Sequence, residues 1–184
     1  MVALPSLWLS IVLASVLVFI ASALIWAVLN IHSRDWKKLP DEDAVMDVFR
    51  STSTGRGSYF FPSHIGKDVR SSEYKERAKR GPVGIVTLFD SGAMGKAMGL
   101  GLVYYLVVSF FVAYLASRTL APGTEYLQVF RVVGTAAFLA YGFAHIPHSI
   151  WFGKSWAGTA RDLLDAFIYA MLTAGSFAGF WPGS

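Results

Sequence analysis

The 184-residue chain contains no cysteine. Disulfide frameworks, thiolate metal sites and cysteine nucleophiles are therefore excluded. Charged residues are also scarce. They form 15% of the chain, whereas an average soluble domain has about a quarter.

Apolar side chains are what the chain has in excess. Hydrophobic residues make up 54% of the sequence, and the mean hydropathy is +0.48. This composition predicts an integral membrane protein, and the lack of cysteine fits the bacterial inner (cytoplasmic) membrane. The formal net charge of +4 would suit nucleic acid, but the basic residues flank hydrophobic segments, where lysine and arginine set topology. We therefore expect the lipid bilayer, and no nucleic acid, as a partner.

Four segments have the length and apolarity of membrane spans, for which roughly 20 mostly apolar residues are needed. They are residues 7–31, 97–118, 125–152 and 161–181. The predicted fold class is an all-α polytopic membrane protein with four transmembrane helices. Its expected divisions are a first transmembrane helix at 1–31, a membrane-hugging loop at 32–96 and a three-helix transmembrane region at 97–184.

The distribution of cations predicts the orientation of these spans. Residues 32–95 contain eleven of the sixteen lysines and arginines. Loops retained in the cytoplasm carry such an excess, so we expect loop 32–96 to be cytoplasmic and both termini periplasmic. Tryptophan and arginine at the span ends are the expected interfacial anchors. These residues are Trp8, Trp181 and Arg131 on the outer side, and Trp36, Trp151 and Trp156 on the inner side.

The loop is expected to contain two short interfacial helices. The first begins with Pro40 and the acids that follow it, and extends to Arg50. The second covers "SSEYKERAKR" at 71–80 and stops at Gly81-Pro82. Between them, "STSTGRGSYFFPSH" at 51–64 is interpreted as irregular chain.

Small residues recur at helical spacing in two of the spans. In lipid, such patterns mark faces where helices approach each other closely. They predict helix packing, within the chain or against another subunit. In the last span, the pattern consists of Ala166, Ala170, Ala174 and Ala178 with Gly175 and Gly179, and at the start of the second span it consists of Gly95 and Gly99.

His145 and His148 lie three residues apart near the inner end of the third span, with Pro147 between them. As metal ligands they would need partners, and the candidates are Asp162, Asp165 and His32. A haem held by two histidines would need His32 with His145. The favoured interpretation is that the histidines are interfacial and bond to lipid, water or backbone, that the aspartates cap the last span, and that no cofactor is bound.

Residues 81–123, "GPVGIVTLFDSGAMGKAMGLGLVYYLVVSFFVAYLASRTLAPG", and 148–182, "HSIWFGKSWAGTARDLLDAFIYAMLTAGSFAGFWP", resemble segments of small, uncharacterised four-span inner-membrane proteins of bacteria. This resemblance implies the same four-span topology. It assigns no catalytic residue to these positions.

No segment carries a strong catalytic motif. We therefore expect a non-catalytic accessory or scaffold subunit that packs against a larger membrane complex, such as a photosynthetic or respiratory one. One alternative is a metal- or haem-binding membrane enzyme that uses His145 and His148. A second alternative is a small transporter.

Overall fold

The computed structural model describes residues 1–66, 68–90, 92 and 94–183, and the chain is mostly helical. It divides into two compact units. Met1–Trp36 and Met94–Ser184 form a helical unit, and Lys37–Ala93 form a second, smaller unit.

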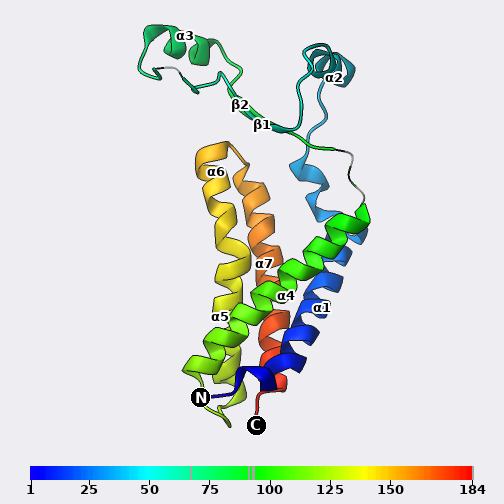
Figure 1. The fold of residues 1–184 in the computed structure, drawn as a ribbon, viewed down its shortest axis with the longest axis vertical. Helices are drawn as coiled ribbons and strands as arrows, with labels where there is room; N and C mark the ends of the chain where they lie inside the picture. Colours follow the sequence, from blue (N-terminus) through cyan, green and yellow to red (C-terminus); the bar gives the residue numbers. More distant parts are fainter. Residues whose placement is uncertain (67, 91, 93, 184) are drawn as a thin grey trace. The chain divides into compact units, whose positions relative to one another are not determined.

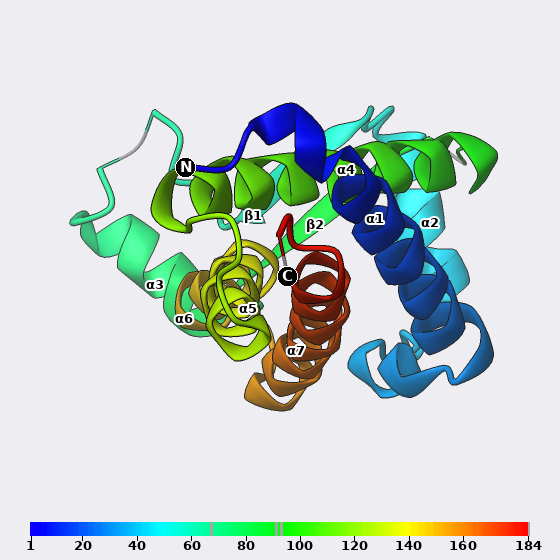
Figure 2. The ribbon, with the colours of Figure 1, turned by 90° about the horizontal axis from the view of Figure 1, so that it is seen from below.

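The helical unit is a bundle of long helices (Figure 1). In chain order its elements are the 3₁₀ turn η1 (Leu4–Leu7), α1 (Trp8–Ala23), the π-helical turn η2 (Leu24–Val28), the 3₁₀ turn η3 (Ile31–Asp35), α4 (Met94–Thr119), α5 (Tyr126–Gly142), the 3₁₀ turn η4 (Phe143–His145), α6 (Ile146–Phe152) and α7 (Trp156–Gly179). Seen end-on, α7 lies between α5 and α1, and α4 crosses beside α1 and α5 (Figure 2). The N-terminus and the C-terminal end of the chain lie at the same end of this bundle (Figure 1).

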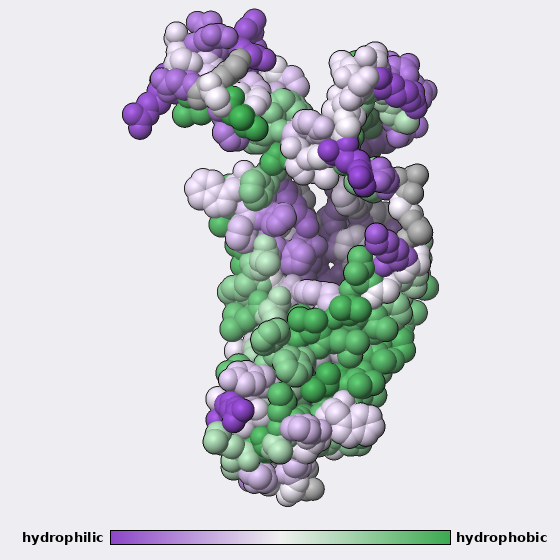
Figure 3. Space-filling model, in the orientation of Figure 1, coloured by the Kyte–Doolittle hydropathy of each residue, from purple (hydrophilic) through white to green (hydrophobic). Residues whose placement is uncertain are grey.

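Three helical segments are long and apolar enough to cross a membrane. They are Leu4–Val28, Met94–Thr119 and Tyr126–Phe152, which correspond to the first three predicted spans. Their hydrophobic side chains cover most of the bundle surface in view (Figure 3). The predicted membrane character of the chain is thus confirmed at this level. Helix α7 does not belong to this group, because its first three turns carry Arg161, Asp162 and Asp165.

The most extensive helix pairing, between α5 and α7, depends on two glycines of α5. A Cβ at Gly134 would lie 3.3 Å from Ala174 Cβ, and one at Gly142 would lie 3.1 Å from Ala166 Cβ. The two contacts lie eight residues apart on each helix. Their order along the chain is reversed on α7, as antiparallel packing requires. The close approach of α5 and α7 therefore leaves no room for a side chain at either glycine.

Ala166 and Ala174 of the last predicted span form the other half of these two contacts. Ala166, Ala170, Ala174 and Ala178 are all at least 98% buried inside the chain. The two glycines of the same pattern, Gly175 and Gly179, do not pack closely against another helix. Gly175 has only the Tyr126 hydroxyl near its Cβ position, at 4.0 Å, and Gly179 has nothing within 4 Å. Gly95 and Gly99 at the start of α4 also have open space at their Cβ positions. Within the chain, the alanines pack against another helix, whereas these glycines do not.

Helix α1 ends earlier than its apolar run, which extends to Ile31. The helix widens into the π-helical turn Leu24–Val28, and Asn30 then adopts a left-handed conformation with φ 49°. Asparagine tolerates this conformation better than most residues. The reversal sends Ile31–Asp35 back toward α7, so that His32 becomes buried.

The second unit contains two helices and a two-stranded antiparallel sheet. Helix α2 (Glu42–Ser51) is capped by Asp41, and α3 (Ser72–Arg80) is capped by Ser71, in the two places where the sequence predicts helices. Strands β1 (Gly57–Phe61) and β2 (Gly84–Leu88) pair antiparallel, with Tyr59 opposite Val86. The expectations of an all-α fold and of irregular chain at 51–64 are therefore wrong at these strands. The aromatic residues of β1 favour a strand, but its partner lies more than 20 residues away in the sequence.

The tryptophans expected as interfacial anchors differ in exposure. Trp8, Trp36, Trp151 and Trp156 are each more than 60% exposed, and Arg131 is also exposed. Trp181 is instead 2% exposed, and its Nε1–H donates to the Ala121 carbonyl at 2.9 Å. Trp181 thus ties the end of the chain to the turn between α4 and α5, and it does not project outward as an anchor would.

Candidate functional site

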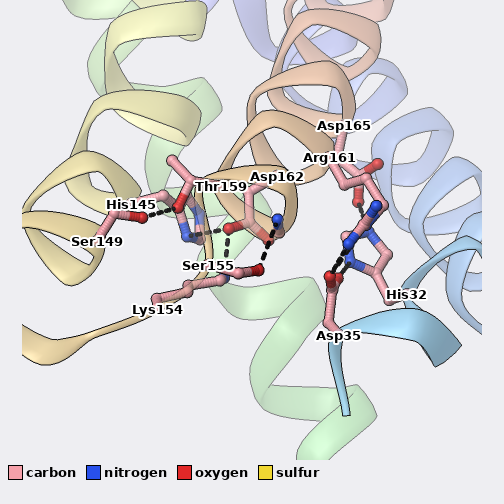
Figure 4. Close-up of polar contacts among 11 residues, drawn as sticks. His32, Asp35, His145, Ser149, Lys154, Ser155, Thr159, Arg161, Asp162 and Asp165 are labelled. Atoms are coloured by element: carbon pink, nitrogen blue, oxygen red, sulfur yellow. Dashed lines mark hydrogen bonds and ion pairs between the residues drawn. The ribbon is translucent and has the colours of Figure 1, made fainter. Parts of the chain in front are cut away.

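Polar side chains gather at the end of the bundle where α7 begins (Figure 4). Ser155 starts this helix, because its Oγ accepts a hydrogen bond from the Gly158 backbone N–H at 3.0 Å. The second and third turns of α7 carry Asp162 and Asp165, whose side chains are 6% and 8% exposed. Buried carboxylates are costly unless they are paired, so their partners define the site.

His32 is the partner of Asp165. Its Nε2 lies 3.0 Å from Asp165 Oδ2, and its Nδ1 lies 2.8 Å from Asp35 Oδ2. The two ring nitrogens of His32 thus bridge the carboxyl groups of Asp35 and Asp165. The ring of Trp26 stacks on the imidazole, with centroids 4.0 Å apart.

Asp35 in turn pairs with Arg161. Both Nε, at 3.0 Å, and a terminal nitrogen of the guanidinium donate to Asp35 Oδ1. This hydrogen bond lowers the pKa of the Asp35 carboxyl below its ordinary value, and the hydrogen bond from His32 acts in the same direction. Gly158 makes the approach feasible, because a Cβ there would lie 3.0 Å from Asp35 Oδ1.

Asp162 anchors a separate set of contacts one turn earlier on α7. Its Oδ2 pairs with Lys154 Nζ and lies 3.4 Å from His145 Nδ1. The hydroxyl groups of Ser149 and Thr159 form a hydrogen bond, with their oxygens 2.5 Å apart. The two aspartates thus lie on one helix, and each faces a different histidine from a different part of the chain (Figure 4).

The structure separates His145 from His148. His148 is exposed and contacts the Phe152 ring, whereas His145 turns toward Asp162. Among the described residues, no group of three or more histidines and acids could hold a metal ion. Of the residues in the alternative metal set, His145 and Asp162 lie in one cluster, His32 and Asp165 in the other, and His148 in neither. The alternative haem pair has no support either, because both ring nitrogens of His32 face carboxylates.

A cavity of about 150 Å³ opens between these two clusters. Asp162, Asp165 and His145 are the ionisable residues of its wall other than tyrosine. Most of the remaining wall is aromatic and consists of Trp26, Tyr104, Tyr105, Tyr141 and Tyr169. In the surface view, hydrophilic residues line a recess in the otherwise hydrophobic bundle (Figure 3).

The four tyrosines form one interlocked group. Tyr105 and Tyr141 each pack edge to face against Tyr169, with centroids 6.0 and 5.7 Å apart, and the Tyr105 hydroxyl donates to Ser22 Oγ at 2.9 Å. The Tyr141 hydroxyl is buried without a hydrogen bond in the described part of the chain. Such mutual packing fixes the rings in place.

This aromatic wall is not predicted from the sequence. Tryptophan and tyrosine gather at span ends in membranes, so their presence alone predicts anchors and not a cavity. The available signal was that these four tyrosines, with hydroxyls that need partners, lie inside or near the predicted spans. Their convergence on one cavity depends on how α4, α5 and α7 pack.

Comparison with family models, with curated proteins and with solved structures finds no match to this chain.

Proposed function

We propose that this chain is a four-span protein of the bacterial inner membrane, without catalysis of its own, that packs as an accessory or scaffold subunit against a larger membrane complex. Loop 32–96 lies in the cytoplasm in this proposal, and both termini are periplasmic. The cation distribution and the three long apolar helices support the membrane placement.

Helix α7 serves as the fourth span in this proposal. The polar residues that lower its hydropathy face the interior, where Asp162 and Asp165 each have a partner. Polar groups inside a bundle are tolerated when they pair with each other and avoid lipid. The antiparallel packing of α7 against α5 over most of its length also supports a crossing.

The observation that carries the accessory role is the open space beside the helix glycines. A Cβ at Gly95, Gly99 or Gly179 would meet no heavy atom within 4 Å. Glycines at helix spacing gain nothing from lipid, but they allow another helix to approach closely. A separate apolar groove of about 430 Å³ lies between α1 and the start of α4. The chain's own packing uses Gly134 and Gly142, so Gly95, Gly99 and Gly179 are available to another subunit.

A small transporter is the second candidate function, and the cavity beside Asp162 and Asp165 favours it. Ionisable residues on a membrane helix that line a cavity are typical of substrate or ion pathways. The enzyme alternative has less support, because His145 and His148 point to different surroundings.

Cross-linking and affinity purification in a mild detergent test the accessory role. Wild-type protein should bring down defined membrane subunits, and Gly99→Leu or Gly179→Leu should lose them while the protein still accumulates. Ala160→Leu is the matched control, because it adds bulk at an exposed position of α7. Equal recovery of the same subunits with all three variants would contradict the proposal.

A further inference from the structure

The cavity beside Asp162 and Asp165 has the chemistry of a cation site. Two carboxylates lie in its wall, and His145 is the only described residue there that can carry a positive charge. Both contacts of Asp162, with Lys154 and with His145, use Oδ2, so Oδ1 has no hydrogen bond or ion pair among the described residues. The wall therefore favours a positively charged occupant over an anion.

The aromatic rings narrow the class of cation. Hard inorganic ions such as Mg²⁺ and Ca²⁺ take about six or more oxygen ligands, and this wall is mostly aromatic carbon. Rings instead attract ammonium groups through their negative faces, and cages of aromatic residues are a common way to bind methylated ammonium. Trp26 is one of these rings, and stacking against the His32 ring holds it in place.

The volume limits the size of the ligand. About 150 Å³ corresponds to roughly five water molecules at about 30 Å³ each. A ligand of about five non-hydrogen atoms would fill it. Because the tyrosines already hold each other edge to face, little ordering is needed when such a ligand binds.

We propose that this cavity binds a small organic ammonium ion of about five non-hydrogen atoms, with the aromatic rings around its methyl groups and the carboxylates of Asp162 and Asp165 balancing its charge. The site lies within the helical unit. It is independent of the accessory role, because its residues differ from the open glycines of α4 and α7.

Calorimetric titration of the full-length protein in lipid nanodiscs tests this site. Tetramethylammonium chloride is the probe, and we expect saturable binding at one site. Tert-butanol is the matched control, because it has a similar size and no charge, and it should not bind. Sodium chloride at the same ionic strength should not compete.

Three variants of α4 separate a ring contact from a general effect. Tyr104 is part of the wall, and Tyr114 lies on the same helix away from the cavity, with nearly equal exposure of 49% and 47%. Tyr104→Leu should weaken binding about tenfold, because it removes a ring face. Tyr104→Phe should keep most of the affinity, and Tyr114→Leu should leave it unchanged.

A variant of α7 tests the charge. Asp162→Asn removes one carboxylate of the wall and leaves Lys154 without its partner, so binding should weaken by more than about tenfold. The proposal is overturned if tetramethylammonium does not bind, if tert-butanol binds equally well, or if the variants of Tyr104 and Asp162 bind like wild type. Co-purification of membrane subunits is scored separately, so failure of this site leaves the accessory role standing.

Discussion

His32 Nε2 and Asp165 Oδ2 lie 3.0 Å apart, although 133 positions separate the two residues in the chain. The histidine is 3% exposed and the aspartate side chain 8%. This buried contact joins the turn after α1 to the third turn of α7. It therefore fixes the end of the first helix against α7, which lies between α5 and α1.

Removing one member of this pair should destabilise the bundle strongly. His32→Leu leaves the Asp165 carboxylate buried without its partner, and we expect a loss of about 3–5 kcal/mol in the free energy of unfolding. His148→Leu is the control. His148 is exposed, and its substitution should change stability by no more than about 0.5 kcal/mol. Reversible unfolding in mixed micelles measures both.

The double variant His32→Leu/Asp165→Leu distinguishes a specific pair from a general effect on packing. Replacing both partners removes the uncompensated charge, so much of the lost stability should return. If the double variant is less stable than His32→Leu alone, the contact between these two side chains does not explain the effect.

The sequence predicts the helices of this fold well and their contacts poorly. Long apolar runs determine where α1, α4 and α5 occur, because lipid requires continuous helices of that length. The His32–Asp165 contact depends on the reversal at Asn30, and hydropathy carries no signal for that reversal. The pairing of β1 with β2 was missed for a similar reason, since each strand is short and its partner is distant.

In the candidate site too, the sequence indicates the residues but not the contacts between them. Asp162, Asp165 and His145 drew attention in the sequence because ionisable residues near spans are rare. The structure brings a different histidine to each aspartate, because His145 follows α5 and His32 follows α1. The aromatic wall was not predicted, because tyrosines on separate helices share no sequence pattern.

The stability of the bundle should depend on pH through Asp35. Its carboxyl has a lowered pKa in the folded protein, since Arg161 and His32 donate to it. Its contribution is therefore complete above the unfolded value of 3.8 and is lost as the pH falls through the lower folded pKa. Asp35→Asn should melt at a lower temperature than wild type at pH 7, and the difference should shrink as the pH falls below about 4.

Thermal melts between pH 3 and pH 7 measure this difference. Asp47→Asn is the control, because Asp47 pairs with Arg50 on an exposed helix, where an ion pair contributes little. A constant difference between Asp35→Asn and wild type across this range would show that the carboxylate charge is not involved.

The two kinds of helix glycine should respond differently to a large side chain. Gly142→Leu forces atoms into the contact with Ala166, and we expect it to lower the free energy of unfolding by about 1–3 kcal/mol. Gly99→Leu enters open space and should leave the stability of the isolated protein nearly unchanged. Thermal melts of both variants in detergent measure this difference in stability. Equal destabilisation would mean that the close approach of α5 and α7 is not the cause.

Cysteine labelling should show how many times the chain crosses the membrane. The protein has no cysteine of its own, so single substitutions report one position each. We compare Ser58→Cys in β1, Glu125→Cys in the turn before α5, and Ser184→Cys at the last residue, which lies outside the described residues. If α7 crosses the membrane, positions 125 and 184 lie on the same side of it. The chain between them then crosses the membrane twice, once through α5 and once through α7.

An impermeant maleimide applied to intact spheroplasts should therefore label positions 125 and 184, and should label position 58 only after lysis. The Gly123 N–H donates to the Pro182 carbonyl at 2.8 Å, so the turn before α5 and the segment after α7 lie together at one end of the bundle. Labelling of position 125 without 184 would reduce the chain to three spans. Labelling of position 58 in intact spheroplasts, with 125 and 184 protected, would keep four spans and reverse the orientation that the lysines and arginines predict.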